Sequence, residues 1–174
     1  PNGEFNQAEV AQAVKQSNKI VGDAVAHYLE HARDRLCIVF AVDIEHATTL
    51  LKAYLAAGVA AELVTGKDLD TVRLSTMKRF ERRETLVLIN VDLFGEGTDV
   101  PGVEVVQMCR PTASFPLFVQ QIGRMLRLDI SPELMAMWEG LPIVERHAQI
   151  AGSRKPRALL IDHAGTMFRE FNTC

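Results

Sequence analysis

The chain has 174 residues, of which 48% are hydrophobic and 24% charged, and its formal net charge is −3. This length and composition predict one globular domain with a sizeable core and exclude a largely disordered chain. The weakly acidic balance argues against a free-standing, non-specific nucleic-acid binder, although a local basic patch is compatible with it.

The cysteines and the hydropathy of the chain indicate which cellular compartment to expect for the protein. Cys37, Cys109 and Cys174 are widely spaced and match no metal-binding pattern. The first two lie in apolar runs, as reduced core cysteines do, so we expect a cytoplasmic protein. No apolar run reaches membrane-spanning length and no signal peptide is visible, so we expect no membrane partner. Because the chain begins with Pro1, we expect it to be a piece of a longer protein.

Apolar runs alternate with helical patterns along the whole chain. The apolar runs are continuous, which is typical of strands buried on both faces of a parallel sheet. We expect strands at 36–42, 60–64, 85–91, 103–109 and 157–162, and helices at 7–16, 21–33, 45–57, 71–82, 116–127 and 132–149. This order predicts a single α/β domain over 1–174, a mostly parallel sheet with helices on both faces. Ligands of such sheets lie beyond the carboxyl ends of the strands.

Several segments resemble known ligand loops but lack essential residues. "VTGKDLD" (64–70) lacks the Gly that should stand six positions before Lys67, so a turn is favoured over a phosphate-binding loop. Asp43 and Glu45 resemble a magnesium-binding acid pair, but no phosphate loop precedes them. The histidines have no ligand spacing, and no nucleophile stands beside a base. We therefore predict no metal site and no bond-breaking chemistry by this domain alone.

A glycine-bearing turn, "FGEGTDVPG" (94–102), follows the third predicted strand. Its glycines allow a close approach of the backbone to a ligand, and Asp99 can accept hydrogen bonds from ribose hydroxyls. The alternative is a turn that only guides the chain path.

The segment "CRPTASFP" (109–116) follows the fourth predicted strand. It brings Arg110, Thr112 and Ser114 to the same carboxyl edge as the glycine-bearing turn. A cation with hydroxyl donors suits the phosphate backbone of a nucleic acid. An ordinary role at the entry of the following helix is the alternative.

The helix predicted from "FVQQIGRMLRLD" (118–129) carries a polar stripe. On a helical wheel Gln120, Arg124 and Arg127 lie within about 60° of one another. The opposite, apolar side is formed by Val119, Ile122, Met125 and Leu126. A solvated face would explain the stripe, and so would a pair of cations aimed at a nucleotide that another domain holds.

In this order and at this spacing, the motifs resemble the C-terminal RecA-like domain of superfamily 2 helicases and translocases. The resemblance is strongest to the restriction-enzyme Res-subunit and phage-type DEAD/DEAH-like branch. "IVFAVDIEHATTLLKAYLAAGVAAELVTG" resembles the motif IV region, and "VLINVDLFGEGTDVPGVEVVQMCRPTAS" resembles motif V with its flanks. "QQIGRMLR" matches the motif VI pattern Q-x-x-G-R-x-x-R, and "ALLIDHAG" resembles the last strand. The resemblance covers about residues 20–165 and implies a three-layer RecA-like fold.

The resemblance also implies a nucleotide site shared with another lobe. Arg124 and Arg127 would be catalytic arginine fingers that reach the γ-phosphate of ATP. Gln120, Gly97 and Asp99 would contact the nucleotide. Walker A and Walker B motifs are absent. ATP and its Mg²⁺ would therefore be held by an N-terminal RecA-like lobe of the same polypeptide, and we expect the isolated chain to be inactive.

For the nucleic acid, the resemblance favours DNA, single- or double-stranded, over RNA. The candidate contacts are Thr98, Arg110, Thr112, His46 and Thr65. The leading hypothesis is the second motor domain of an ATP-dependent DNA helicase or translocase. One alternative is a non-catalytic nucleic-acid-binding or interaction module with the same fold. Another is an α/β enzyme that binds a small nucleotide by itself at "GEGTD".

Overall fold

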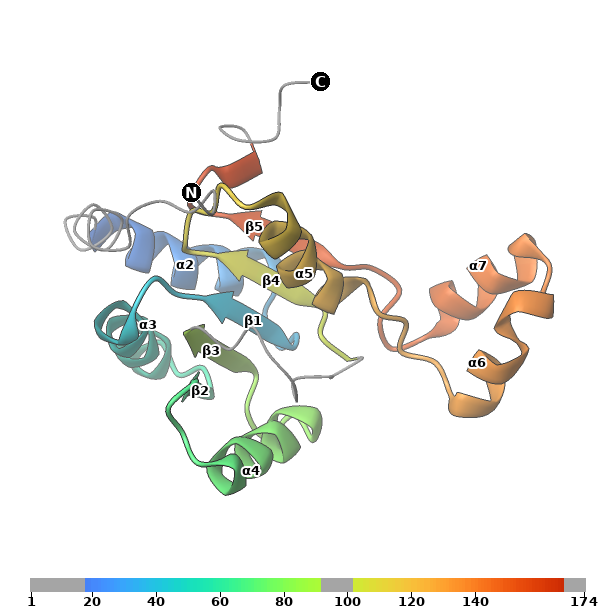
Figure 1. Ribbon diagram of the computed structural model, residues 1–174, viewed down its shortest axis with the longest axis horizontal. Helices are drawn as coiled ribbons and strands as arrows, with labels where there is room; N and C mark the ends of the chain where they lie inside the picture. Colours follow the sequence, from blue (N-terminus) through green and yellow to red (C-terminus); the bar gives the residue numbers. More distant parts are fainter. Residues whose placement is uncertain (1–17, 92–101, 168–174) are drawn as a thin grey trace.

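The computed structural model describes residues 18–91 and 102–167 (Figure 1). The helix predicted at 7–16 lies outside these residues. The five strands are β1 (Cys37–Phe40), β2 (Ala61–Thr65), β3 (Val87–Val91), β4 (Val105–Met108) and β5 (Leu159–Asp162). They pair in the order β2-β3-β1-β4-β5, and every pairing is parallel. The predicted α/β class and parallel sheet are therefore confirmed.

The strand register aligns the carboxyl ends at one edge of the sheet. Phe40 pairs with Asn90 on one side and with Met108 on the other, and Met108 pairs with Asp162. Each of these residues is the last, or next to last, in its strand. The loops that follow β1, β3, β4 and β5 consequently all leave from the same edge.

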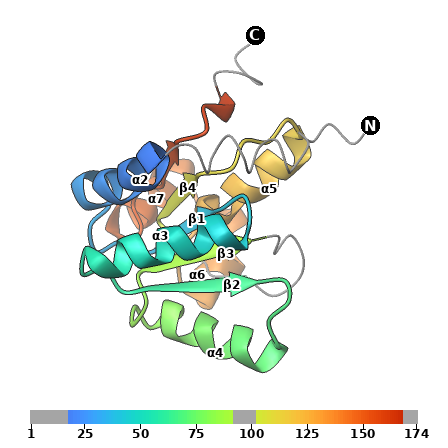
Figure 2. The ribbon, with the colours of Figure 1, turned by 90° about the vertical axis from the view of Figure 1, so that its left-hand side faces the viewer.

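Helices cover both faces of the sheet, which gives three layers (Figures 1 and 2). The covering helices are α2 (Asn18–His31), α3 (Ile44–Ala56), α4 (Asp70–Glu81) and α5 (Phe115–Leu126). Successive strand residues point to opposite faces, so β1 supplies Val39 to the core under α2 and α3 and Ile38 to the core under α4 and α5. Tyr54 from α3 and Phe80 from α4 are fully buried in these two cores.

The helix α5 begins as expected but differs from its predicted wheel. Ser114 caps it, because its hydroxyl accepts a hydrogen bond from the Leu117 amide at 3.4 Å. The helix buries Phe118, Gln121 and Met125 against the sheet. Val119 and Leu126 are 43% and 61% exposed, so the prediction that they form the packed side is wrong. The buried line runs along positions 118, 121 and 125, and its centre lies about 75° around the helix from the centre of the predicted apolar side.

The continuous helix predicted at 132–149 is also wrong. The segment forms α6 (Pro132–Met137), the short 3₁₀ helix η1 (Trp138–Gly140) and α7 (Ile143–Gly152). Pro142 stands at the N-cap of α7, where its ring and missing amide prevent a helix from running through. Neither α6 nor α7 buries a residue, and the pair projects away from the sheet (Figure 1). Across 18–91 and 102–167, no helix is long and apolar enough to span a membrane.

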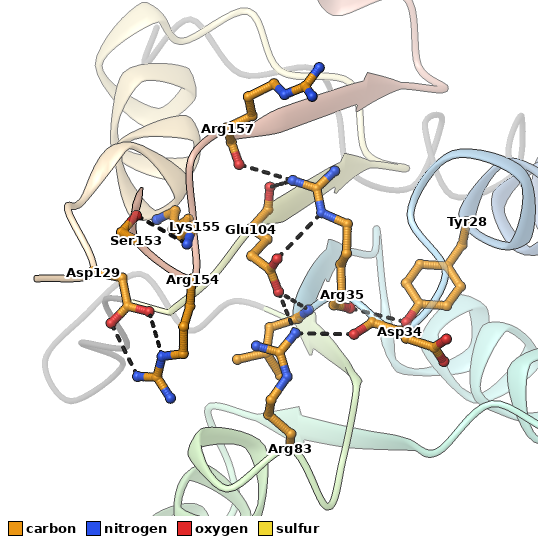
Figure 3. A network of polar contacts seen from close by, with 11 residues as sticks. Tyr28, Asp34, Arg35, Arg83, Glu104, Asp129, Ser153, Arg154, Lys155 and Arg157 are labelled. Atoms are coloured by element: carbon orange, nitrogen blue, oxygen red, sulfur yellow. Dashed lines mark hydrogen bonds and ion pairs between the residues drawn. The ribbon is translucent and has the colours of Figure 1, made fainter. Parts of the chain in front are cut away.

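The amino edge of the sheet is held by a buried carboxylate, Glu104 (Figure 3). Glu104 accepts hydrogen bonds from the Leu36 amide at 2.9 Å and from Arg83 Nη2 at 2.6 Å. Arg35 reaches the same carboxylate at 3.5 Å and also donates to the Arg157 carbonyl at 2.9 Å. The chain segments entering β1, β3, β4 and β5 are thereby tied together at the edge opposite the predicted ligand loops.

Candidate functional site

Four residues predicted to contact nucleic acid lie near the carboxyl edge and are buried. Thr65 ends β2, His46 lies in the first turn of α3, and Arg110 and Thr112 lie between β4 and α5. Their exposed fractions are 8%, 4%, 5% and 0%, in that order. Such burial leaves little of these side chains for a strand to touch from the described surface, and their nucleic-acid role stays a prediction.

Local hydrogen bonds explain two of these positions. Asp68 Oδ2 accepts from the Thr65 amide at 2.6 Å, and Thr65 Oγ1 accepts from the Lys67 amide at 3.3 Å. These bonds close a turn, as predicted for "VTGKDLD" in preference to a phosphate loop. Thr112 Oγ1 accepts from the Ser114 amide at 3.3 Å and so shapes the entry to α5.

His46 belongs to the start of α3. Its amide donates to Asp43, the N-cap residue, at 2.7 Å, and its Nδ1 accepts from the Val42 amide at 3.4 Å. Burial lowers the pKa of His46 below its ordinary value, against the smaller opposing effect of Asp43. The ring is therefore neutral near pH 7, and it does not supply a cation for phosphate.

The motif V residues predicted to contact nucleotide or nucleic acid, Gly97, Thr98 and Asp99, lie outside the described residues. The structure does define where their segment is attached. The described chain stops at Val91, the last residue of β3 at the carboxyl edge, and resumes at Gly102, shortly before β4 begins at the amino edge.

The polar stripe of α5 is present over its last two turns. Gln120 is exposed, and Arg124 is partly buried one turn later. Burial lowers the pKa of the Arg124 guanidinium, although this group stays a cation at any physiological pH. Residues three and four apart lie side by side on a helix, so Gln120, Gly123 and Arg124 share one surface.

Gly123 has no evident structural reason to be glycine. A methyl group built on it would meet no described atom within 4 Å, and its φ does not lie in the left-handed region. Glycine in a helix interior costs roughly 1 kcal/mol relative to alanine. An open surface beside Gln120 and Arg124 is what a closely approaching ligand or partner would need.

Arg127 lies one residue beyond the helix, and its predicted place inside the helix is wrong. It is the C-cap, with an extended backbone of φ −65° and ψ 138°. Its carbonyl accepts a hydrogen bond at 2.6 Å from Nζ of Lys155, which lies just before β5. Two residues further, Asp129 pairs with Arg154 at 3.4 Å (Figure 3).

The direction of α5 decides where Arg127 lies. The buried polar residues lie near the carboxyl edge, and α5 runs from there back toward the amino ends of the strands (Figure 1). Arg127 consequently lies beside the segment that enters β5.

The end of α5 carries side chains of the kinds that contact nucleotides in proteins. Two guanidinium groups and the Gln120 amide suit phosphate oxygens. Among the described parts of the chain, no three His, Cys, Asp or Glu residues are grouped so that they could hold a metal ion.

Sequence reasoning missed Lys155 and its neighbours. The segment "AGSRKPR" (151–157) is loop-like and carries three cations before the last strand. That composition was the available signal, but the contact with Arg127 depends on how β5 returns beside α5. Only the folded chain reveals it.

Comparisons with known proteins agree with the fold and the motifs. The helicase conserved C-terminal domain family matches residues 20–129. A 51.5 kDa protein of Lactococcus phage (isolate 7-9) is 36% identical over 126 residues, which are 72% of this chain and 27% of that protein. IRC3 of Saccharomyces cerevisiae, which its name assigns to the ATP-dependent helicases, is 33% identical over 119 residues, 68% of this chain and 17% of IRC3. The chain thus spans about a quarter of the length of these relatives or less.

Solved structures with the same fold include helicase domains. The Escherichia coli DEAD-box protein SrmB, bound to the regulator RraA, has a TM-score of 0.59 at 23% identity over 82% of this chain and 70% of that chain. Domain 2 of the DEAD-box helicase Mss116p, bound to an RNA duplex, has a TM-score of 0.55 at 21% identity over 82% of this chain and 50% of that chain. At these identities the likeness shows a shared RecA-like fold. Together with the match over residues 20–129, it establishes that the chain belongs to the helicase conserved C-terminal domain family.

Proposed function

We propose that this chain is the second motor lobe of an ATP-dependent DNA helicase or translocase. In this role it completes an ATP site that an N-terminal lobe provides. The observation that carries the proposal is the surface at the end of α5, where Gln120 and Arg124 flank the open Gly123. Arg127 follows at the C-cap. Neither the backbone conformation of Gly123 nor its surroundings require glycine there.

The chemistry of the proposed site is electrostatic. ATP supplies the phosphoryl group, and negative charge builds on its oxygens as the terminal bond breaks. Arg124 and Arg127 would approach these oxygens when the two lobes close. Arg124 is partly desolvated, which strengthens its attraction to a phosphate compared with a fully hydrated cation. Closure that depends on ATP would alter the grip on a nucleic acid and so move the motor along it.

DNA is the proposed track, with motif V and the carboxyl edge as the region of contact. The burial of Thr65, His46, Arg110 and Thr112 favours an indirect role for these side chains. They would support the backbone of the loops that touch the strand. Direct phosphate contacts would then come from backbone amides and from the 92–101 segment, which includes Thr98.

The proposal is tested by measuring ATP binding and ATP hydrolysis for the isolated chain and for the chain joined to its ATP-binding lobe. The isolated chain should bind ATP with a dissociation constant above the millimolar range and hydrolyse none. Joined to its ATP-binding lobe, it should hydrolyse ATP at a rate that rises with added single-stranded DNA.

Two outcomes favour other functions. Sub-millimolar ATP binding by the isolated chain would favour an α/β enzyme that uses the motif V turn by itself. Salt-sensitive DNA binding by the isolated chain, with no DNA-stimulated hydrolysis in the joined protein, would favour a non-catalytic binding module. Stronger stimulation by RNA than by DNA would overturn the choice of track alone.

A further inference from the structure

Lys155 lies between the end of the motif VI helix and the start of β5. Its side chain is buried, with 7% of the residue exposed, although lysine is rarely buried without a partner. Its Nζ donates to the Arg127 carbonyl at 2.6 Å, a short distance that is typical of a charged donor. The buried ammonium group of Lys155 thus binds the backbone of Arg127, one of the two proposed arginine fingers.

The position of this carbonyl explains why a cation suits it. The last carbonyls of a helix have no partner within the helix, and the C-terminal end of the helix dipole is negative. Arg127 is the C-cap of α5, and its backbone turns from helical to extended at this residue. The hydrogen bond from Lys155 therefore fixes the place and the direction in which the chain leaves the helix.

Lys155 is itself held in place by the end of α7. Its amide donates to Ser153 Oγ at 3.2 Å (Figure 3). Ser153 Oγ in turn donates to the Ile150 carbonyl at 2.8 Å. Ser153 is the C-cap of α7. The turn at 153–155 thus links the C-terminal ends of two helices, α5 and α7, through one buried side chain.

We propose that Lys155 is a positioning residue for Arg127: by binding its carbonyl, it sets the direction in which the Arg127 guanidinium leaves α5 toward the nucleotide. This inference rests on the proposed function, because it needs Arg127 to act on ATP. It adds a residue outside the helicase motifs and outside the matched range 20–129. It also gives the turn before β5 a part in hydrolysis.

The test is a double-mutant cycle in the full-length protein that carries this domain and its ATP-binding lobe. Hydrolysis of ATP is measured with saturating single-stranded DNA for the parent, Arg127→Ala, Lys155→Met and the double variant. Lys155→Met should lower kcat by roughly 10- to 100-fold, as a small misplacement of a catalytic group does, with KM for ATP within about twofold of the parent. In the Arg127→Ala background, Lys155→Met should cause no further loss, since it acts through that arginine.

Arg154→Ala is the matched control on the same turn. Arg154 pairs with Asp129, but its side chain is 80% exposed, so kcat should stay within about twofold of the parent. Thermal melting establishes that each variant is folded. If Lys155→Met does not fold, Lys155→Gln replaces it under the same criteria.

The outcomes separate the two proposals. If Arg127→Ala hydrolyses ATP like the parent, the finger role fails, and the positioning role fails with it. If Arg127→Ala loses activity while Lys155→Met keeps it, only the positioning role is overturned. It is also overturned if the losses of the two single variants multiply in the double variant, or if Arg154→Ala loses as much as Lys155→Met.

Discussion

Arg83 and Glu104 form an ion pair of 2.6 Å between the turn that follows α4 and the residue that precedes β4. The Glu104 side chain is 9% exposed, whereas that of Arg83 is 38% exposed. The same carboxylate accepts a hydrogen bond from the Leu36 amide at 2.9 Å. One buried acid therefore joins the entries of three neighbouring strands, β1, β3 and β4.

The first prediction concerns the stability that this acid provides. Glu104→Gln should lower the free energy of unfolding by about 1–3 kcal/mol, because two arginines lose their shared partner in a mostly buried place. Denaturant titration of the chain measures this. Glu84→Gln is the control, since Glu84 is 52% exposed and lies 3.9 Å from Arg82, and its effect should be below about 0.5 kcal/mol. Equal effects of both substitutions would contradict the account.

The second prediction concerns the stability of the fold at acidic pH and the contribution of Glu62 to it. Glu62 accepts hydrogen bonds from Arg79 and from Thr85 and Thr76. The Arg79 hydrogen bond is the main reason that the pKa of Glu62 is lowered. A lowered pKa stabilises the fold above the ordinary glutamate value of about 4.3, and that contribution is lost as pH falls through the folded-state value. The difference in unfolding free energy between the parent and Glu62→Gln should therefore be constant above about pH 5 and shrink below about pH 4. A difference that does not change with pH would show that the pairing has no effect on stability.

The third prediction concerns the stability of the fold at alkaline pH and the contribution of Lys155 to it. Burial lowers the pKa of Lys155 to about 8, although Asp129 and Glu104 act to raise it; Arg127 acts in the same direction as burial. Between pH 8 and the ordinary lysine value of about 10.4, the unfolded chain binds more protons than the folded chain, so stability rises with pH. From pH 7 to pH 10, the parent should gain about 1–3 kcal/mol relative to Lys155→Met. Denaturant titrations of both proteins at the two pH values measure the gain, and a constant difference would contradict it.

The fourth prediction separates stability from function at Gly123. Gly123→Ala should stabilise the domain by up to about 1 kcal/mol, because alanine favours the helix and no described atom obstructs the methyl group. The same change should lower DNA-stimulated ATP hydrolysis, since it places a methyl group on the surface proposed to meet the nucleotide. Gly22→Ala is the matched control: Gly22 is an exposed position of α2 with the same open space. It should stabilise the domain and leave hydrolysis unchanged. A Gly123→Ala protein with full activity would show that this surface is not used.

The sheet was predictable because burial on both faces leaves a clear pattern. Continuous apolar runs such as "CIVF" and "VLINV" identified all five described strands and their parallel pairing. The ends of helices were harder to predict, because tertiary contacts decide them. Arg127 continues the helical spacing of Gln120 and Arg124, yet the buried Lys155 binds its carbonyl where α5 ends.

The sequence allowed the motifs of the candidate site to be predicted. It was a poorer guide to which of their side chains are buried and which are exposed. The pattern Q-x-x-G-R-x-x-R is a short local signal, and the family match supports its interpretation. Whether a polar residue near a strand end is exposed depends on the loops around it. Thr112 and Arg110 looked like surface groups in the sequence, and the structure buries both. The helical wheel placed Gln120 on the polar side of α5 but gave no sign that the neighbouring Gln121 is buried.

The central claim is that Arg127 acts on ATP that another lobe holds. The most direct measurement is kcat for DNA-stimulated ATP hydrolysis by the protein that contains this chain and its ATP-binding lobe, comparing the parent, Arg127→Ala and Arg82→Ala. Arg82 is the control arginine, on the surface at the end of α4 with a side chain that is 70% exposed. We expect Arg127→Ala to lower kcat by roughly 10³-fold or more, as the loss of an arginine finger does in other NTPases, and Arg82→Ala to leave it unchanged. Hydrolysis by Arg127→Ala at the parent's rate, in a folded protein that still binds ATP, would contradict the claim.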